Sequence, residues 1–131
     1  MLKVFTSIYS YNGPNRLDIT AKGNDSIGKL FAPSWDLVMK WKNHEINKKQ
    51  YVSEYYKLMR KSYLSKQEAW DNLLGKDTVV LVCFEKPEDG FCHRLILAGI
   101  LQKLGADYRG ELRRDGTFWG KLDLNEFKEE K

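Results

Sequence analysis

The feature that most constrains the fold is an uninterrupted apolar run at residues 78–84, followed by a turn and a longer apolar segment. The run shows strong β character and no alternation of apolar and polar positions, which is typical of a strand covered on both faces in a parallel sheet. Residues 91–104 are nearly all apolar and stop at Gly105, as a buried helix with a glycine C-cap does. Strand, tight turn and buried helix make half of a βαβ unit, so we predict an α/β fold.

Further strands are predicted on both sides of this unit. Residues 2–9 are rich in β-branched and aromatic residues and stop at the turn formed by residues 12–15. Residues 17–21 alternate apolar and polar positions, and residues 107–112 would close the βαβ unit. The Asp115-Gly116 pair indicates a turn within a C-terminal hairpin.

Three helices are predicted between these strands, each from a start signal. Ser34 can cap the first, Asn47 with Gln50 resembles a capping box for a helix to about Tyr63, and Ser65 with Glu68 repeats that arrangement. The middle helix carries an apolar stripe with basic flanks, composed of Tyr51, Tyr55, Leu58, Met59 and Tyr63 with Lys48, Lys49, Lys57, Arg60 and Lys61. We therefore expect a single three-layer α/β domain over residues 1–131, with a small, mainly parallel sheet flanked by helices.

Length and composition exclude several classes of protein. A chain of 131 residues is about one domain long, and 42% hydrophobic residues indicate a folded globule. No apolar stretch approaches the roughly 18 residues of a membrane helix, and the first ten residues lack a secretory signal, so we expect a cytoplasmic protein without a membrane partner. The two cysteines cannot make a disulfide framework, and we expect both thiols to be reduced.

The formal net charge of +4 is unevenly distributed, with +5 in residues 1–75 and −1 in residues 76–131. This modest asymmetry suits an anionic ligand or weak nucleic-acid contact. It falls short of the concentrated basic face of a dedicated nucleic-acid binder.

The predicted site lies at the carboxyl end of strand 78–84, because ligands of open α/β sheets bind outside the carboxyl ends of the strands. Reactive side chains gather there, namely Cys83, Glu85, Cys92, His93 and Arg94. A cation at a helix N-terminus is unfavourable by roughly 0.3 to 1 kcal/mol, so an anion should offset Arg94. A phosphate or carboxylate ligand would do so, held by Arg94 and the helix amides. Alternatively, Arg94 pairs with Glu85 or Glu88 and binds no ligand.

Each of these side chains has a predicted role. Glu85 would act as general base or ribose hydroxyl acceptor, His93 as acid or hydrogen-bond donor, and Cys92 as a nucleophile whose thiol pKa the helix start lowers. Arg94 and Cys83 would bind the ligand, although Cys83 also fits a plain core residue. If the strands run parallel, further ligand-binding residues line the same rim, namely Thr6, Ser7, Tyr9, Thr20 and Lys22.

The residues around this site resemble the signature of the family called domain of unknown function 488, or DUF488. The resemblance rests on residues 80–87, on Phe91-Cys92-His93-Arg94 and on the helix ending at Leu104-Gly105. It extends to residues 5–7, 18–23 and 31–35 and to Tyr51 and Tyr55, and spans about residues 2–112. The resemblance implies an α/β fold with a polar pocket around the Cys-x-Glu and Cys-His-Arg positions. It implies no reaction, and it leaves the hairpin and tail at 113–131 outside.

The sequence therefore predicts that a small anionic, nucleotide-like ligand binds at the strand ends, where it could be hydrolysed or transferred. We expect no cofactor and no metal, since Cys83, Cys92 and His93 with Glu85 do not match the usual zinc spacing. Two alternatives remain. One is a nucleic-acid-associated protein that uses the basic aromatic helix 47–63, and the other is a thiol-based redox sensor that uses Cys92.

Overall fold

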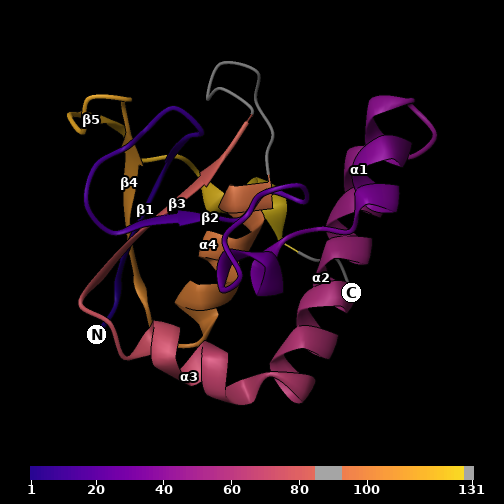
Figure 1. Ribbon diagram of the computed structural model, residues 1–131. Helices are drawn as coiled ribbons and strands as arrows, with labels where there is room; N and C mark the ends of the chain where they lie inside the picture. The colour runs from indigo at the N-terminus through magenta and orange to yellow at the C-terminus, as the bar shows by residue number, and fades with distance from the viewer. Residues whose placement is uncertain (85–92, 129–131) are drawn as a thin grey trace.

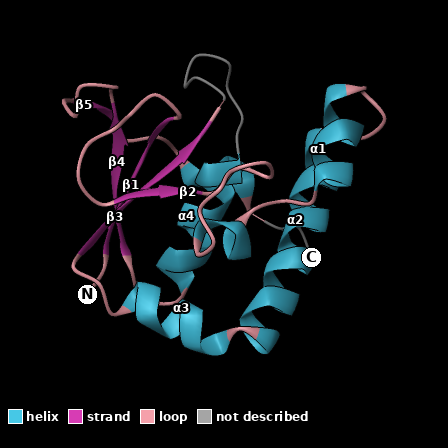
Figure 2. Ribbon diagram, viewed as in Figure 1, coloured by secondary structure: helices cyan, strands magenta, loops and turns pink. Residues whose placement is uncertain are grey.

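The computed structural model describes residues 1–84 and 93–128 and contains a five-stranded sheet with helices beside it (Figure 1 and Figure 2). The strands are β1 (Lys3–Ile8), β2 (Arg16–Asp18), β3 (Thr78–Cys83), β4 (Asp107–Leu112) and β5 (Phe118–Gly120). The α-helices are α1 (Trp35–Lys42), α2 (Lys48–Ser65), α3 (Gln67–Leu74) and α4 (His93–Lys103), with 3-10 helices η1 (Gly28–Phe31) and η3 (Leu124–Phe127). The predicted α/β fold with a C-terminal hairpin is confirmed.

The sheet has the strand order β2-β3-β1-β4-β5. Strands β2, β3, β1 and β4 are parallel, and β5 pairs antiparallel with β4. Parallel pairing brings the carboxyl ends of four strands to the same edge of the sheet. Strand β3 is buried along nearly its whole length, which explains why its sequence shows no alternation.

The two faces of the sheet are covered differently. Helix α4 packs against β1, β3 and β4, and α2 packs against α4, so that α4 lies between the sheet and α2 (Figure 1). On the opposite face, Val80 and Val82 form a small second cluster with Tyr11 from the loop after β1. The main hydrophobic core therefore lies on the side of the helices.

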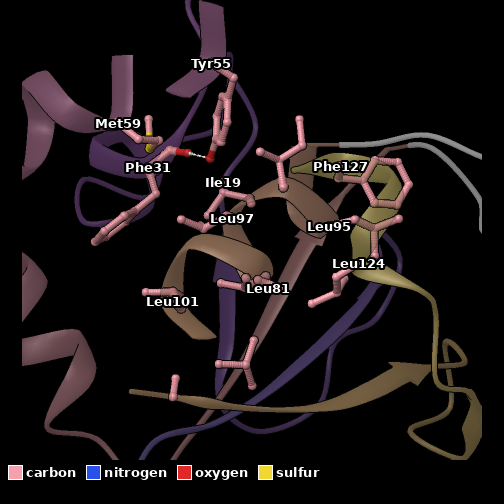
Figure 3. Close-up of a cluster of buried hydrophobic side chains, with 14 of the residues drawn as sticks. Ile19, Phe31, Tyr55, Met59, Leu81, Leu95, Leu97, Leu101, Leu124 and Phe127 are labelled. Carbon is pink, nitrogen blue, oxygen red and sulfur yellow. Dashed lines mark hydrogen bonds between the residues drawn. The ribbon is translucent and has the colours of Figure 1, made fainter. Parts of the chain in front are cut away.

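This core joins segments that are distant in the sequence (Figure 3). Helix α4 contributes Leu97 and Leu101, and the Tyr55 hydroxyl donates a hydrogen bond of 2.6 Å to the Phe31 carbonyl oxygen. Helix η3 adds the buried side chains of Leu124 and Phe127, so the chain returns to the core after the hairpin. Neither 3-10 helix was expected from the sequence, because four-residue helices carry too little periodicity to be seen.

The helix caps test the start signals directly. The capping box of Asn47 and Gln50 is present, with both reciprocal hydrogen bonds at 2.8 Å. Ser34 caps α1 by accepting a hydrogen bond from the Leu37 amide. The expected cap at Ser65 is wrong, because α2 extends to this residue and its hydroxyl donates to the Lys61 carbonyl oxygen, which leaves Lys66 as the N-cap of α3.

These caps predict the outcome of two matched substitutions. Asn47→Ala removes the side chain that accepts a hydrogen bond from the Gln50 amide, which has no acceptor within the helix. The substitution should lower the free energy of unfolding by about 1 kcal/mol. Ser65→Ala should change it by less than about 0.5 kcal/mol, since the exposed hydroxyl caps nothing. Urea unfolding followed by circular dichroism measures both, and equal losses in the two variants would contradict the assignment of the caps.

Candidate functional site

A pocket of about 230 Å³ lies at the carboxyl ends of β2 and β3, where ligands of open α/β sheets bind. Its walls come from the residues after β2, the residue after β3, helix α1 and the first residues of α2 and α4. They are Thr20, Ala21, Lys22, Trp35, Val38, Trp41, Lys42, Tyr51, Phe84 and His93. Three residues of the predicted site, Thr20, Lys22 and His93, therefore meet in one pocket.

The pocket combines aromatic walls with positive charge. The Trp41 and Tyr51 rings make an edge contact with centroids 5.8 Å apart. The ammonium groups of Lys22 and Lys42 lie 4.2 and 6.0 Å from the centroid of the half-exposed Trp35 ring. Among residues 1–84 and 93–128, no carboxylate lines the pocket, and neither lysine forms an ion pair with another of these residues.

His93 is the first described residue of α4 and is held by the segment after β2. Its Nε2 lies 2.7 Å from the Ile19 carbonyl oxygen. Because a carbonyl oxygen only accepts hydrogen bonds, Nε2 carries the proton and Nδ1 carries the lone pair of the neutral ring. Burial lowers the pKa of His93 to about 4, against a smaller raising effect of the Ile19 hydrogen bond. The ring is therefore neutral at pH 7, and its Nε2 proton is already engaged in the fold.

Thr20 is positioned by the Asp18 carboxylate, which was not among the predicted site residues. Asp18 is buried and accepts hydrogen bonds from the Thr20 amide at 2.9 Å and from its hydroxyl at 2.6 Å. A Cβ on Gly23 would lie 2.6 Å from the Asp18 Oδ2 atom, so this close approach requires glycine. The Asp-x-Thr spacing at the end of a strand is the signal that could have identified this turn.

Arg94 lies inside the protein and does not line the pocket. Its side chain is 1% exposed and forms a bidentate ion pair with Glu111 of β4, Nε to Oε1 at 3.1 Å and Nη2 to Oε2 at 3.0 Å. Nη1 donates to the Cys83 sulfur at 3.1 Å. The sequence predicts that Arg94 binds an anionic ligand, with pairing to Glu85 or Glu88 as the alternative; both glutamates lie outside the described residues, as does Cys92. Glu111 was not predicted as the partner of Arg94. The sequence signal that points to it is a charged residue at an inward-facing position of a strand.

Cys83 is fully buried at the end of β3. Its sulfur is part of a disulfide bond, so the expectation of a reduced thiol is wrong for this residue. The side chain faces Arg94 and the core, and Cys83 is absent from the lining of the pocket. The structure thus places it behind the site.

The predicted residues of β1 and its loop divide into two groups. Thr6 and Ser7 are fully buried, the Thr6 hydroxyl paired with the Tyr108 hydroxyl at 3.0 Å and the Ser7 hydroxyl donating to the Leu112 carbonyl oxygen at 2.7 Å. They join β1 to β4 and are not brought to the pocket. Tyr9 stacks on Phe84 with ring centroids 4.4 Å apart, so it supports the pocket wall from behind.

The aromatic stripe of α2 is turned inward. Tyr51, Tyr55 and Met59 are buried, so these side chains belong to the core and their rings are not offered to a nucleic-acid strand. Among residues 1–84 and 93–128, no helix combines the length and hydropathy needed to cross a bilayer.

Comparison with known proteins agrees with the resemblance seen in the sequence. The family model described as the active DUF488-N3 subclade matches residues 5–105. The chain belongs to the DUF488 family. The DUF488 match runs from Phe5 within β1 to the end of α4 and includes every described residue that lines the pocket, whereas β4, β5 and η3 lie beyond it. Comparison with curated proteins and with solved structures finds no match.

The lowered pKa of His93 makes the stability of the protein depend on pH. The unfolded histidine binds a proton near pH 6.5 and the folded one near pH 4, so acidification between these values favours the unfolded state. We expect this group to lower the free energy of unfolding by about 2 kcal/mol between pH 7 and pH 5. Between pH 7 and pH 5, the His93→Gln variant should lose about 2 kcal/mol less free energy of unfolding than the wild type, because glutamine does not titrate. Urea unfolding at both pH values measures the difference, and identical pH dependence in the two proteins would refute the buried neutral ring.

Proposed function

We propose that this DUF488 protein binds a small anionic, nucleotide-like ligand in the pocket at the carboxyl ends of β2 and β3. The observation that carries the proposal is the pair of lysines, Lys22 and Lys42, beside the Trp35 ring in a pocket whose described lining contains no carboxylate. Two cations next to an apolar wall favour a ligand that is negative at one end and flat at the other.

Two kinds of side chain in the pocket lining would recognise the ligand, namely aromatic rings and lysine ammonium groups. A planar ring can pack against the indoles of Trp35 and Trp41, which supply large contact areas with few rotatable bonds. The anionic group of the ligand would then meet the ammonium groups of Lys22 and Lys42. His93 adds a neutral ring to the wall, so Lys22 and Lys42 are the only charged groups among the described residues of the lining.

The size of the pocket limits the ligand. A volume of about 230 Å³ lies below the range of roughly 300 to 1,000 Å³ that is usual for drug-sized ligands. One ring system with a small anionic substituent fits this space better than two linked nucleotides. A mononucleotide or a smaller relative of one is therefore the proposed ligand.

Hydrolysis or transfer of the ligand remains a prediction from the sequence. Its general base Glu85 and nucleophile Cys92 lie outside the described residues. Of the predicted catalytic groups, His93 alone belongs to the described pocket, and a ring with a pKa of about 4 is unprotonated at neutral pH. Its state suits a hydrogen-bond acceptor better than the general acid expected from the sequence.

Ligand binding is tested by comparing nucleoside monophosphates with their uncharged nucleosides. We expect the monophosphates of adenosine, guanosine, cytidine or uridine to raise the melting temperature and to titrate calorimetrically, and the nucleosides to bind at least about tenfold more weakly. The double variant Lys22→Ala/Lys42→Ala should weaken monophosphate binding by about tenfold or more, because it removes both cations from the pocket.

A matched control keeps the change in net charge the same. Lys29→Ala/Lys61→Ala removes two exposed lysines that do not line the pocket, and it should leave the dissociation constant within about twofold. The proposal fails if no monophosphate binds, or if both double variants lose affinity equally.

A further inference from the structure

Four aromatic side chains are exposed within the described residues, and two of them take part in no ring–ring or cation–π contact there. Trp35 is flanked by lysines, and Phe84 stacks on Tyr9. Phe118 and Trp119 of β5 are 55% and 43% exposed, and neither ring stacks on another ring or lies under a cation in the described part of the chain. Exposed rings of this kind are available to an external partner.

The hairpin that carries these rings is well defined. At its turn the Asp115 carboxylate accepts hydrogen bonds from the Thr117 amide at 2.9 Å and hydroxyl at 2.6 Å. Gly110 of β4 has a φ of +136°, and a Cβ there would lie 2.5 Å from the Phe118 Cε1 atom, so this ring lies closely over the glycine. The Phe118 ring, held in this way, loses little conformational freedom on binding.

Positive charge accompanies the rings. The Arg113 guanidinium lies beside β5, where its Nη1 donates to the Phe118 carbonyl oxygen at 2.8 Å. Arg114 and Lys121 are exposed, and their side chains form no hydrogen bond or ion pair with any residue in 1–84 or 93–128. Two acids neighbour these cations in the sequence, Asp115 and Asp123. Both accept hydrogen bonds within their own turns, and Asp115 also interacts electrostatically with Arg113.

We propose that this hairpin surface, defined as Arg113, Arg114, Phe118, Trp119 and Lys121, binds single-stranded nucleic acid. Aromatic rings that stack bases, together with cations that meet phosphates, are the two components of sequence-tolerant single-strand sites. The surface lies outside residues 5–105, the part matched by the family, and shares no residue with the pocket, so the inference stands apart from the proposed function.

The geometry selects a single strand over two other partners. Leu112 pairs with Phe118 and Glu111 pairs with Gly120, so Trp119 is the extra residue of a β-bulge in the edge strand β5, next to the exposed Phe118. A single strand has unpaired bases that can stack on such rings, whereas the bases of a duplex are already stacked within the double helix. A second copy of the chain would bring the same positive charges to the edge, and these repel.

Fluorescence anisotropy with fluorescein-labelled, twelve-nucleotide oligothymidylate and oligouridylate tests the proposal on the full chain. We expect binding that weakens steeply between about 50 and 200 mM salt. Trp119→Ala should lower the affinity by about tenfold, since stacking on its ring is lost. Arg114→Ala/Lys121→Ala should reduce the slope of log affinity against log salt by about 1.4, which corresponds to two phosphate contacts.

Two control variants locate the contact. Lys57→Ala/Lys61→Ala makes the same change in net charge on α2 and should alter affinity by less than about twofold. Lys22→Ala/Lys42→Ala should leave oligonucleotide binding intact, which separates this surface from the pocket. Unchanged melting temperatures would establish that the variants are folded.

Three results would overturn the inference. The first is an absence of oligonucleotide binding at 50 mM salt, and the second is an equal loss of affinity in the α2 and hairpin double variants. The third is self-association of the wild-type chain in sedimentation that disappears in Trp119→Ala without any oligonucleotide binding, which would assign the edge to a second copy.

Discussion

The arrangement of the site depends on the buried pairing of Arg94 with Glu111, which joins the first turn of α4 to β4. Both side chains are almost completely removed from water, and such burial is costly unless the two charges face each other with good geometry. The bidentate contact supplies that geometry, and Nη1 of the same arginine also reaches the sulfur at the end of β3. One side chain thus fixes the start of α4 against two strands.

The position of Arg94 also determines where His93, the preceding residue of α4, lies in the pocket. With α4 held by Arg94, His93 bonds to the Ile19 carbonyl oxygen and lies in the pocket wall as a neutral ring. The positive charge of Arg94 is compensated internally by Glu111, so the charge of the described pocket lining comes from Lys22 and Lys42. The start of α4 therefore has a structural role. The loop after β2 and helix α1, which face it, supply the charged groups that are proposed to recognise the ligand.

Local patterns predicted the local features well. The β-branched run of β3, the apolar helix α4, the Asn47 capping box and the hairpin turn each follow from residues that are close in sequence. The expected cap at Ser65 failed for a local reason, because α2 extends two residues beyond its expected end at Tyr63.

The site was harder to predict, since its contacts join distant segments. Thr20, Lys22 and His93 were foreseen, but nothing in the sequence around Arg94 indicates that Glu111 is its partner. Trp35, Trp41 and Lys42 were not predicted as site residues, because their shared wall depends on how α1 packs beside the ends of β2 and β3. Long-range pairing of this kind needs the strand order, which short-range spacing does not contain.

A double-mutant cycle on the buried pair tests this account most directly. Arg94→Met and Glu111→Leu should each lower the free energy of unfolding by about 3 to 5 kcal/mol, because each leaves one buried charge without its partner. The double variant should recover most of that loss, since two apolar side chains leave no charge uncompensated. Urea unfolding of the four proteins gives the coupling energy. Strictly additive losses in the double variant would contradict the claim that the two residues act as one buried pair.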